Sequence, residues 1–122
     1  MLLRGPRTTP TIENHAVHGG QGYAVARRLF TRTDFKSSLF FFSESSLQPG
    51  SSYGDHPHTA DEEVYYIVEG RGLMQVDGEE QEVGPGDAVL TPPGSHHSLR
   101  NTGQGVLKVL VIGAAVAAVA RG

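Results

Sequence analysis

The sequence contains no cysteine, and this absence removes several classes of function at once. Without thiols the chain can form no disulfide, offer no thiolate to a metal and use no thiol as a nucleophile. Cysteine-based zinc fingers and papain-like catalysis are therefore excluded. Any metal that the chain binds must be held by nitrogen and oxygen atoms.

The sequence also lacks a long hydrophobic run and a marked excess of charge. Residues 109–120 are uncharged and mostly apolar, but they fall short of the roughly 20 residues that span a bilayer. The first ten residues lack the apolar stretch of a secretory signal. Ten Lys and Arg against 13 Asp and Glu give a net charge of −3, which offers no electrostatic attraction for nucleic acid or an anionic membrane. We therefore expect a cytoplasmic protein whose partner is a small molecule, with no nucleic-acid or membrane partner.

Glycine and proline, in contrast, are abundant and regularly placed. The 16 Gly and 7 Pro mark turns between short runs rich in β-branched and aromatic residues. These runs lie at 38–44, 64–69, 73–76, 88–91, 95–101 and 106–112. Their spacing predicts an all-β antiparallel sandwich or barrel. Asp77 and Gly78 predict a hairpin turn of type I′, because both central residues of that turn need a positive φ.

A chain of 122 residues is long enough for one domain with a real core. We expect an N-terminal arm over residues 1–20, the barrel over 21–113 and a C-terminal tail over 114–122. Within the tail, Ala114–Ala120 could form a helical turn or two. Residues 39–42 are apolar on both faces of their strand, so we expect one face to meet a second surface, which we interpret as a homodimer interface.

Four potential metal ligands lie in the middle of the chain. His56 and His58 are two residues apart, so on an extended strand both imidazoles point to one face. Glu63 begins the next apolar run and can turn toward the same pocket, while His97 follows a Pro-Gly turn and adds a third imidazole. This set suits zinc, iron, nickel, cobalt, copper or manganese and disfavours calcium and magnesium. One octahedral ion would keep two positions open, as a catalytic centre requires.

The motifs that contain these ligands resemble those of the cupin superfamily. Residues 50–70, GSSYGDHPHTADEEVYYIVEG, resemble its first motif, and residues 86–101, GDAVLTPPGSHHSLRN, resemble its second, with matching spacings. The resemblance covers roughly residues 39–112. It implies an antiparallel double-stranded β-helix, or jelly-roll barrel, whose four ligands face a central pocket, and it is consistent with the homodimer that is common in cupins.

The resemblance and the ligand set together predict a metal-dependent enzyme. Small single-domain cupins include polyketide cyclases, isomerase-like proteins, lyases and dioxygenases. We therefore expect Lewis-acid chemistry, such as isomerisation, cyclisation, elimination or dioxygenation, on a small oxygen-rich metabolite of the carbonyl or polyphenol type. Tyr65 is the candidate acid or base. The residues expected to line the pocket are Tyr65, Ile67, Met74, Val76 and Leu99. The alternative function is a metal-containing module that binds or senses a small molecule without turnover.

Two residues next to the expected ligands receive structural roles. Glu62 precedes Glu63 and has the opposite strand parity, so we expect it to face solvent. His96 lies on the other face of the strand from His97, which favours a surface or interface position.

Other histidines and the nearby basic residues are also assigned no chemistry. His15 and His18 lie in the expected arm, where no apolar periodicity surrounds them, so a solvated or interface role is expected. Arg71 and Arg100 lie near turns or at outward positions. The pocket is therefore expected to lack a cationic side chain and to favour a neutral or carbonyl-rich ligand over a phosphorylated one.

Overall fold

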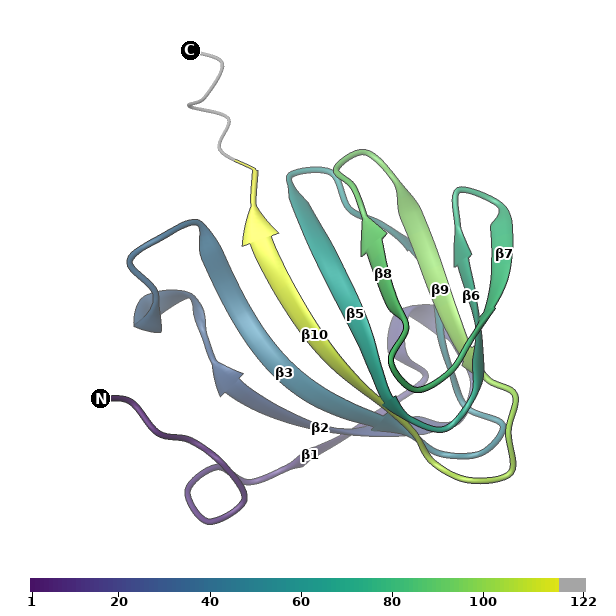
Figure 1. The fold of residues 1–122 in the computed structure, drawn as a ribbon, viewed down its shortest axis with the longest axis horizontal. Coiled ribbons are helices and arrows are strands. Elements are labelled where there is room, and N and C mark those ends of the chain that lie inside the picture. The colour runs from purple at the N-terminus through teal and green to yellow at the C-terminus, as the bar shows by residue number, and fades with distance from the viewer. Residues whose placement is uncertain (117–122) are drawn as a thin grey trace.

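Two antiparallel β-sheets face each other in the computed structural model, which describes residues 1–116 (Figure 1). The larger sheet has the order β1 (Ile12–His15), β2 (Tyr23–Phe30), β3 (Leu39–Leu47), β10 (Leu107–Ala115), β5 (Asp61–Glu69) and β8 (Ala88–Thr91). The smaller sheet has the order β4 (Ser52–Pro57), β9 (His96–Asn101), β6 (Gly72–Val76) and β7 (Glu79–Val83). Two short 3-10 turns, η1 (Val17–Gly19) and η2 (Arg32–Asp34), precede β2 and β3. This architecture confirms the predicted jelly-roll barrel.

The core fills the space between the two sheets and follows the alternation of side chains along the strands. On β5, Glu63, Tyr65 and Ile67 are buried, whereas Tyr66 and Val68 are exposed. This is the inward face that the sequence predicts, because successive side chains of a strand point to opposite faces. The buried hydrophobic cluster consists of Ala24, Phe41, Leu47, Tyr65, Ile67, Met74, Val83, Leu99, Leu107, Val109 and Val111.

The hairpin between β6 and β7 has the predicted turn. Asp77 has a φ of 51° and Gly78 a φ of 83°, and the flanking Val76 pairs with Glu79. Both central residues therefore have the positive φ of a type I′ turn, which glycine adopts without strain.

Several strands differ from the sequence prediction in existence or length. The strands β1 and β2 were not predicted, and part of the expected N-terminal arm forms β1, which pairs with β2 at the sheet edge. The strands β4 and β7 were expected only as the extended segment of His56 and as the second strand of the hairpin. The strand β10 continues to Ala115, so the expected helical turn is wrong for Ala114 and Ala115. There the backbone instead pairs with Asp61 and Glu62 on β5. Residues 117–120 of that expected turn lie outside the described residues.

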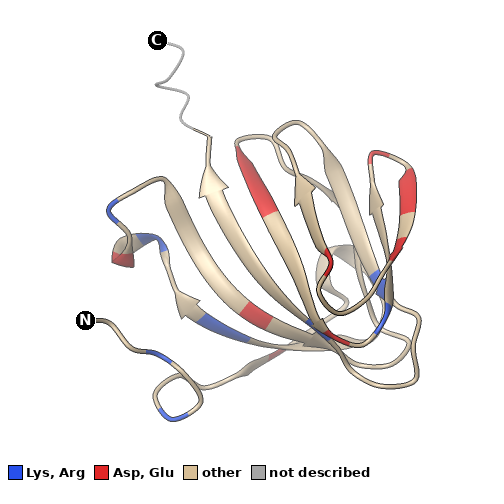
Figure 2. Cartoon of the chain, in the orientation of Figure 1, with Lys and Arg blue, Asp and Glu red and all other residues tan. Residues whose placement is uncertain are grey.

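The outer face of the larger sheet carries apolar side chains. Tyr66, Val68, Leu90 and Ile112 are 44%, 41%, 56% and 38% exposed, respectively. They lie on β10, β5 and the edge strand β8, and Figure 2 shows little charge along β10. In the run 39–42, Phe41 is buried inside the barrel.

In residues 1–116, no helix has the length and apolar character needed to cross a membrane.

Candidate metal centre

The structure brings the four expected ligands together at one end of the barrel. His56 lies on β4, His58 directly after it, His97 on the neighbouring β9 and Glu63 on β5 of the opposite sheet. The Nε2 atom of His97 is 3.0 Å from Nε2 of His56 and 2.9 Å from Nε2 of His58. Oε1 of Glu63 lies 3.4 Å and 3.5 Å from the Nε2 atoms of His58 and His97. One ligand atom from each residue lies within 4.8 Å of all the others.

The outer nitrogen of each ring is held by a neighbouring group. Nδ1 of His56 donates to the carbonyl oxygen of Gly54 at 2.8 Å, and Nδ1 of His58 donates to the carboxylate of Asp61 at 2.9 Å. Nδ1 of His97 and the hydroxyl of Thr91 are 2.6 Å apart. Such outer partners fix the tautomer and the orientation of metal-binding imidazoles.

These hydrogen bonds leave lone pairs directed at a common point. With Nδ1 protonated, the Nε2 atoms of His56 and His58 are acceptors, and both face Nε2 of His97. That atom carries at most one hydrogen, so it cannot satisfy both neighbours. A cation would satisfy all three nitrogens together with the carboxylate of Glu63. The donor set therefore fits a divalent transition metal, whose identity the donors leave open.

Burial sets the electrostatics of the centre. His97 is fully buried, and the removal of water lowers the pKa of its imidazole to about 3, with the charges of His56 and His58 acting in the same direction. Burial likewise raises the pKa of Glu63 to about 7, although the charges of His58 and Arg28 oppose that rise. Neutral imidazoles are the form that binds metal, and a cation beside the carboxylate would favour its charged form.

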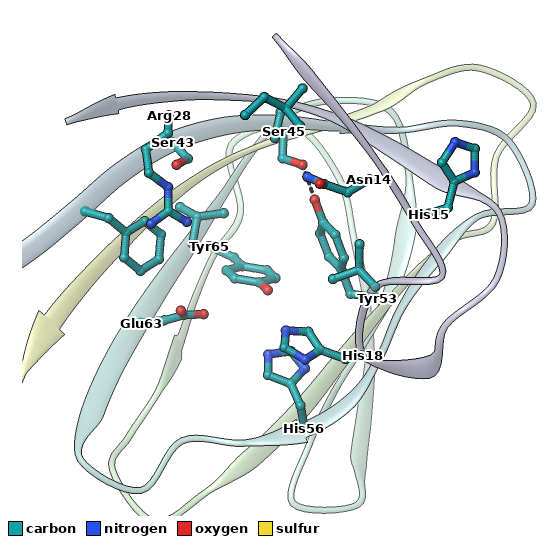
Figure 3. A pocket seen from close by; sticks show the side chains of 15 residues that line it. Asn14, His15, His18, Arg28, Ser43, Ser45, Tyr53, His56, Glu63 and Tyr65 are labelled. Carbon is teal, nitrogen blue, oxygen red and sulfur yellow. Dashed lines mark hydrogen bonds between the residues drawn. The ribbon is translucent and has the colours of Figure 1, made fainter. Parts of the chain in front are cut away.

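An open cavity of about 490 Å³ adjoins the ligands (Figure 3). Its wall combines the ligands His56 and Glu63 with aromatic, aliphatic and small polar side chains. These further lining residues are Ile12, Asn14, His15, Val17, His18, Ala26, Arg28, Phe41, Ser43, Ser45, Tyr53, Tyr65 and Val111. The volume lies within the range typical of small-molecule sites.

Of the residues expected to contact a ligand, Tyr65 alone lines this cavity. Its hydroxyl is 3.5 Å from Nε2 of His97, and burial holds the pKa of the phenol well above its ordinary value. Ile67, Met74 and Leu99 belong to the core, and Val76 packs against it. Contact between these four residues and a ligand stays a prediction. Their side chains pack in the core from the strands β5, β6 and β9.

His18 lies in a position that the sequence reasoning missed. Its exposed position agrees with the expected solvated role, but the ring also lines the cavity and stacks on His56 with centroids 3.6 Å apart. Its backbone has a φ of 52°, which is uncommon for histidine. Gly54 permits this approach, since a Cβ atom there would lie 2.1 Å from the carbonyl oxygen of His18. The glycine two residues before His56 is the available sequence signal.

Arg28 is the second residue that was missed, and it corrects the expectation of a pocket without a cationic side chain. It lines the cavity from β2, and its guanidinium carbon lies 4.5 Å from the centre of the Phe41 ring. Arg71 and Arg100 are not among the cavity-lining residues.

The remaining candidates lie away from the ligand atoms. Glu62 is half-buried and is not part of the ligand group. His96 faces outward and pairs with Asp55, where Nδ1 is 2.8 Å from a carboxylate oxygen. His15 lines the outer part of the cavity and pairs with Glu13.

Comparison with known proteins identifies the family of this chain. Residues 43–113 match the model of the cupin domain. An oxalate-binding protein from Thermotoga maritima is 33% identical over 92% of this chain and 92% of its own length. A crystal structure described as a predicted oxalate decarboxylase, also from Thermotoga maritima, superposes with a TM-score of 0.88 at 29% identity, covering 94% of this chain and 99% of that one. A 5-nitrosalicylic acid 1,2-dioxygenase from Bradyrhizobium sp. is 37% identical over 47% of this chain and 27% of its own length. With both motifs on the barrel and their ligands gathered in its interior, this chain belongs to the cupin family.

Proposed function

We propose that this chain is a divalent-metal-dependent enzyme that acts on a small oxygen-rich metabolite of the carbonyl or polyphenol type. The observation that carries the proposal is the set of converging lone pairs from His56, His58 and His97, beside Glu63, at the wall of an open cavity. A divalent transition metal bound there would supply Lewis-acid polarisation of a substrate oxygen.

The residues around the centre have distinct parts in this chemistry. Gly54, Asp61 and Thr91 orient the three rings from behind. Tyr65 keeps its proton because burial raises its pKa, so its hydroxyl acts as a hydrogen-bond donor to a substrate oxygen rather than as a base.

The cavity also bears on the size of the substrate. Its volume of about 490 Å³ is much larger than a small dicarboxylate such as oxalate would fill. The apolar and aromatic part of its wall suits a carbon skeleton, and the small polar residues suit hydroxyl or carbonyl groups. A ring with adjacent oxygens, as in a catechol or a cyclic β-dicarbonyl, satisfies both demands. Isomerisation, cyclisation, elimination and dioxygenation are all open to such a compound.

A binding or sensing role without turnover is the second candidate. It is favoured by the relative from Thermotoga maritima, which is called an oxalate-binding protein and aligns with 92% of this chain. The same metal centre would then hold its ligand without converting it.

Elemental analysis followed by a turnover assay tests the proposal. We expect about one transition-metal ion per chain, loss of that ion in Glu63→Ala and its retention in the neighbouring control Glu62→Ala. The metal-loaded protein is then incubated with catechols and β-dicarbonyl compounds, and products are followed by mass spectrometry. Conversion that disappears in Glu63→Ala supports the enzyme. Binding without conversion favours the second candidate, and a chain that binds no transition metal refutes both.

A further inference from the structure

The inner face of β2 carries a charge where its neighbours are small and apolar. Ala24, Ala26 and Arg28 alternate on this face, and Ala26 and Arg28 both line the cavity. Arg28 is itself exposed, so water solvates its charge when the open cavity holds no ligand. Among residues 1–116, Arg28 makes neither an ion pair nor a side-chain hydrogen bond.

The contacts of Arg28 hold its guanidinium in place without using its hydrogen-bond donors. The group lies 4.5 Å from the centre of the Phe41 ring, a cation–π arrangement that orients it. Figure 3 shows it on the same side of the cavity as Glu63 and away from His18 and His56. Its five N–H donors are therefore available to a group inside the cavity.

A second unpartnered polar group lies directly beside Arg28. Ser43 is its cross-strand partner on β3, it lines the same cavity, and its side chain is 6% exposed. Its Oγ atom is buried and has no hydrogen-bond partner within residues 1–116. Buried hydroxyls are nearly always paired, so an unpaired one next to a free guanidinium indicates a missing acceptor.

We propose that Arg28 and Ser43 form an anion subsite, separate from the metal-ligating atoms, that binds a carboxylate of the substrate. The guanidinium would supply the charge-assisted hydrogen bonds, and the serine hydroxyl, after rotation about χ1, would supply one more. The inference rests on the proposed function and narrows it. The substrate then has metal-chelating oxygens at one end and a carboxylate at the other, as in a dihydroxy aromatic acid.

A matched set of compounds tests the subsite. The probes are 3,4-dihydroxybenzoate and its homologues with one or two added methylenes, and each is compared with the corresponding amide. Acid and amide share the chelating catechol and differ in charge at the far end. Binding to the protein, with the metal that it carries when purified, is measured by calorimetry.

We expect at least one acid to bind about ten-fold more tightly than its amide, which is the contribution expected of a hydrogen bond between charged groups. In Arg28→Met this preference falls to less than two-fold, while amide affinity and metal content stay unchanged. Arg27→Met is the control, because Arg27 lies on the outer face of the same strand and pairs with Glu44. It should keep the preference.

Ser43→Ala provides an independent readout. We expect it to reduce the preference for the acid and to leave the Tm of the ligand-free protein equal or higher, because the variant removes an unsatisfied buried hydroxyl. Equal binding of acid and amide by the unmodified protein, or an equal loss for both in Arg28→Met, would overturn the subsite alone. If metal is present and no catechol binds, the proposed chelating function fails, and the subsite fails with it.

Discussion

Replacing Asp61 with alanine tests whether the metal centre depends on the groups behind its rings. The carboxylate of Asp61 accepts the hydrogen bond from Nδ1 of His58 at 2.9 Å, and its side chain is 21% exposed. This contact keeps the hydrogen on Nδ1 and leaves Nε2 free for a metal. It also raises the basicity of the ring.

The expected loss of metal affinity follows from the number of rings that are affected. Removal of such an outer partner lowers affinity about 10- to 100-fold, or about 1.4 to 2.7 kcal/mol. His56 and His97 keep their partners Gly54 and Thr91, so the lower end of that range is expected for Asp61→Ala. Asp61→Asn retains an oxygen that can accept the bond, and we expect a loss of only a few fold.

A competition assay with a fluorescent chelator and Zn²⁺ measures these affinities, with circular dichroism as the check on folding. Glu62→Ala is the control, because it removes the adjacent negative charge without touching a ring. An affinity of Asp61→Ala within two-fold of the unmodified protein would refute the reasoning. An equal loss in Glu62→Ala would show that charge in general, rather than the hydrogen bond, is responsible.

Three further predictions concern the rest of the molecule. Asp55 raises the pKa of His96 above 6.5, so the pair contributes stability below pH 6.5 that is lost as pH rises through the raised value. Asp55→Asn should therefore lower the His96 pKa in an NMR titration, and an unchanged value would contradict the contact. Leu99→Ala should reduce the free energy of unfolding by about 2–5 kcal/mol in urea, because Leu99 is completely buried; a loss below 1 kcal/mol would contradict its place in the core. We also propose that the apolar outer face of the larger sheet is the interface of a homodimer, so Leu90→Glu should halve the mass measured by light scattering. An unmodified protein that is already monomeric, or a variant that stays dimeric, would contradict this proposal.

The ligand group was predictable because its signal is local. The spacing of His56 and His58, the strand parity of Glu63 and the turn before His97 each follow from a few neighbouring residues. The same parity correctly separated Glu63 from Glu62. Two motifs at fixed spacings then indicated that the separate segments meet.

The opposite wall of the cavity was not predictable in the same way. Arg28 and His18 come from residues before the motifs, where Gly19, Gly20 and Gly22 mark a turn but nothing indicates which segments pair. Their positions depend on the pairing of β2 with β3 and on the packing of η1 against β4. Such contacts between distant segments leave only weak traces, such as the alternation of Ala24, Ala26 and Arg28 and the glycine at position 54. The pocket residues expected on β6 and β9 were likewise assigned by parity, which separates the inside from the outside but not the cavity from the core.

The donors of the metal centre come from both sheets, since Glu63 lies on β5 and the histidines belong to or follow strands of the smaller sheet. An ion bound there would fasten the two sheets together in a chain that has no disulfide to do so. Binding to the folded state alone stabilises that state, so copies without metal should unfold more readily and be degraded first. We expect the abundance of the protein to follow metal supply, with proteolysis of the metal-free copies enriching the surviving population in metal-loaded molecules.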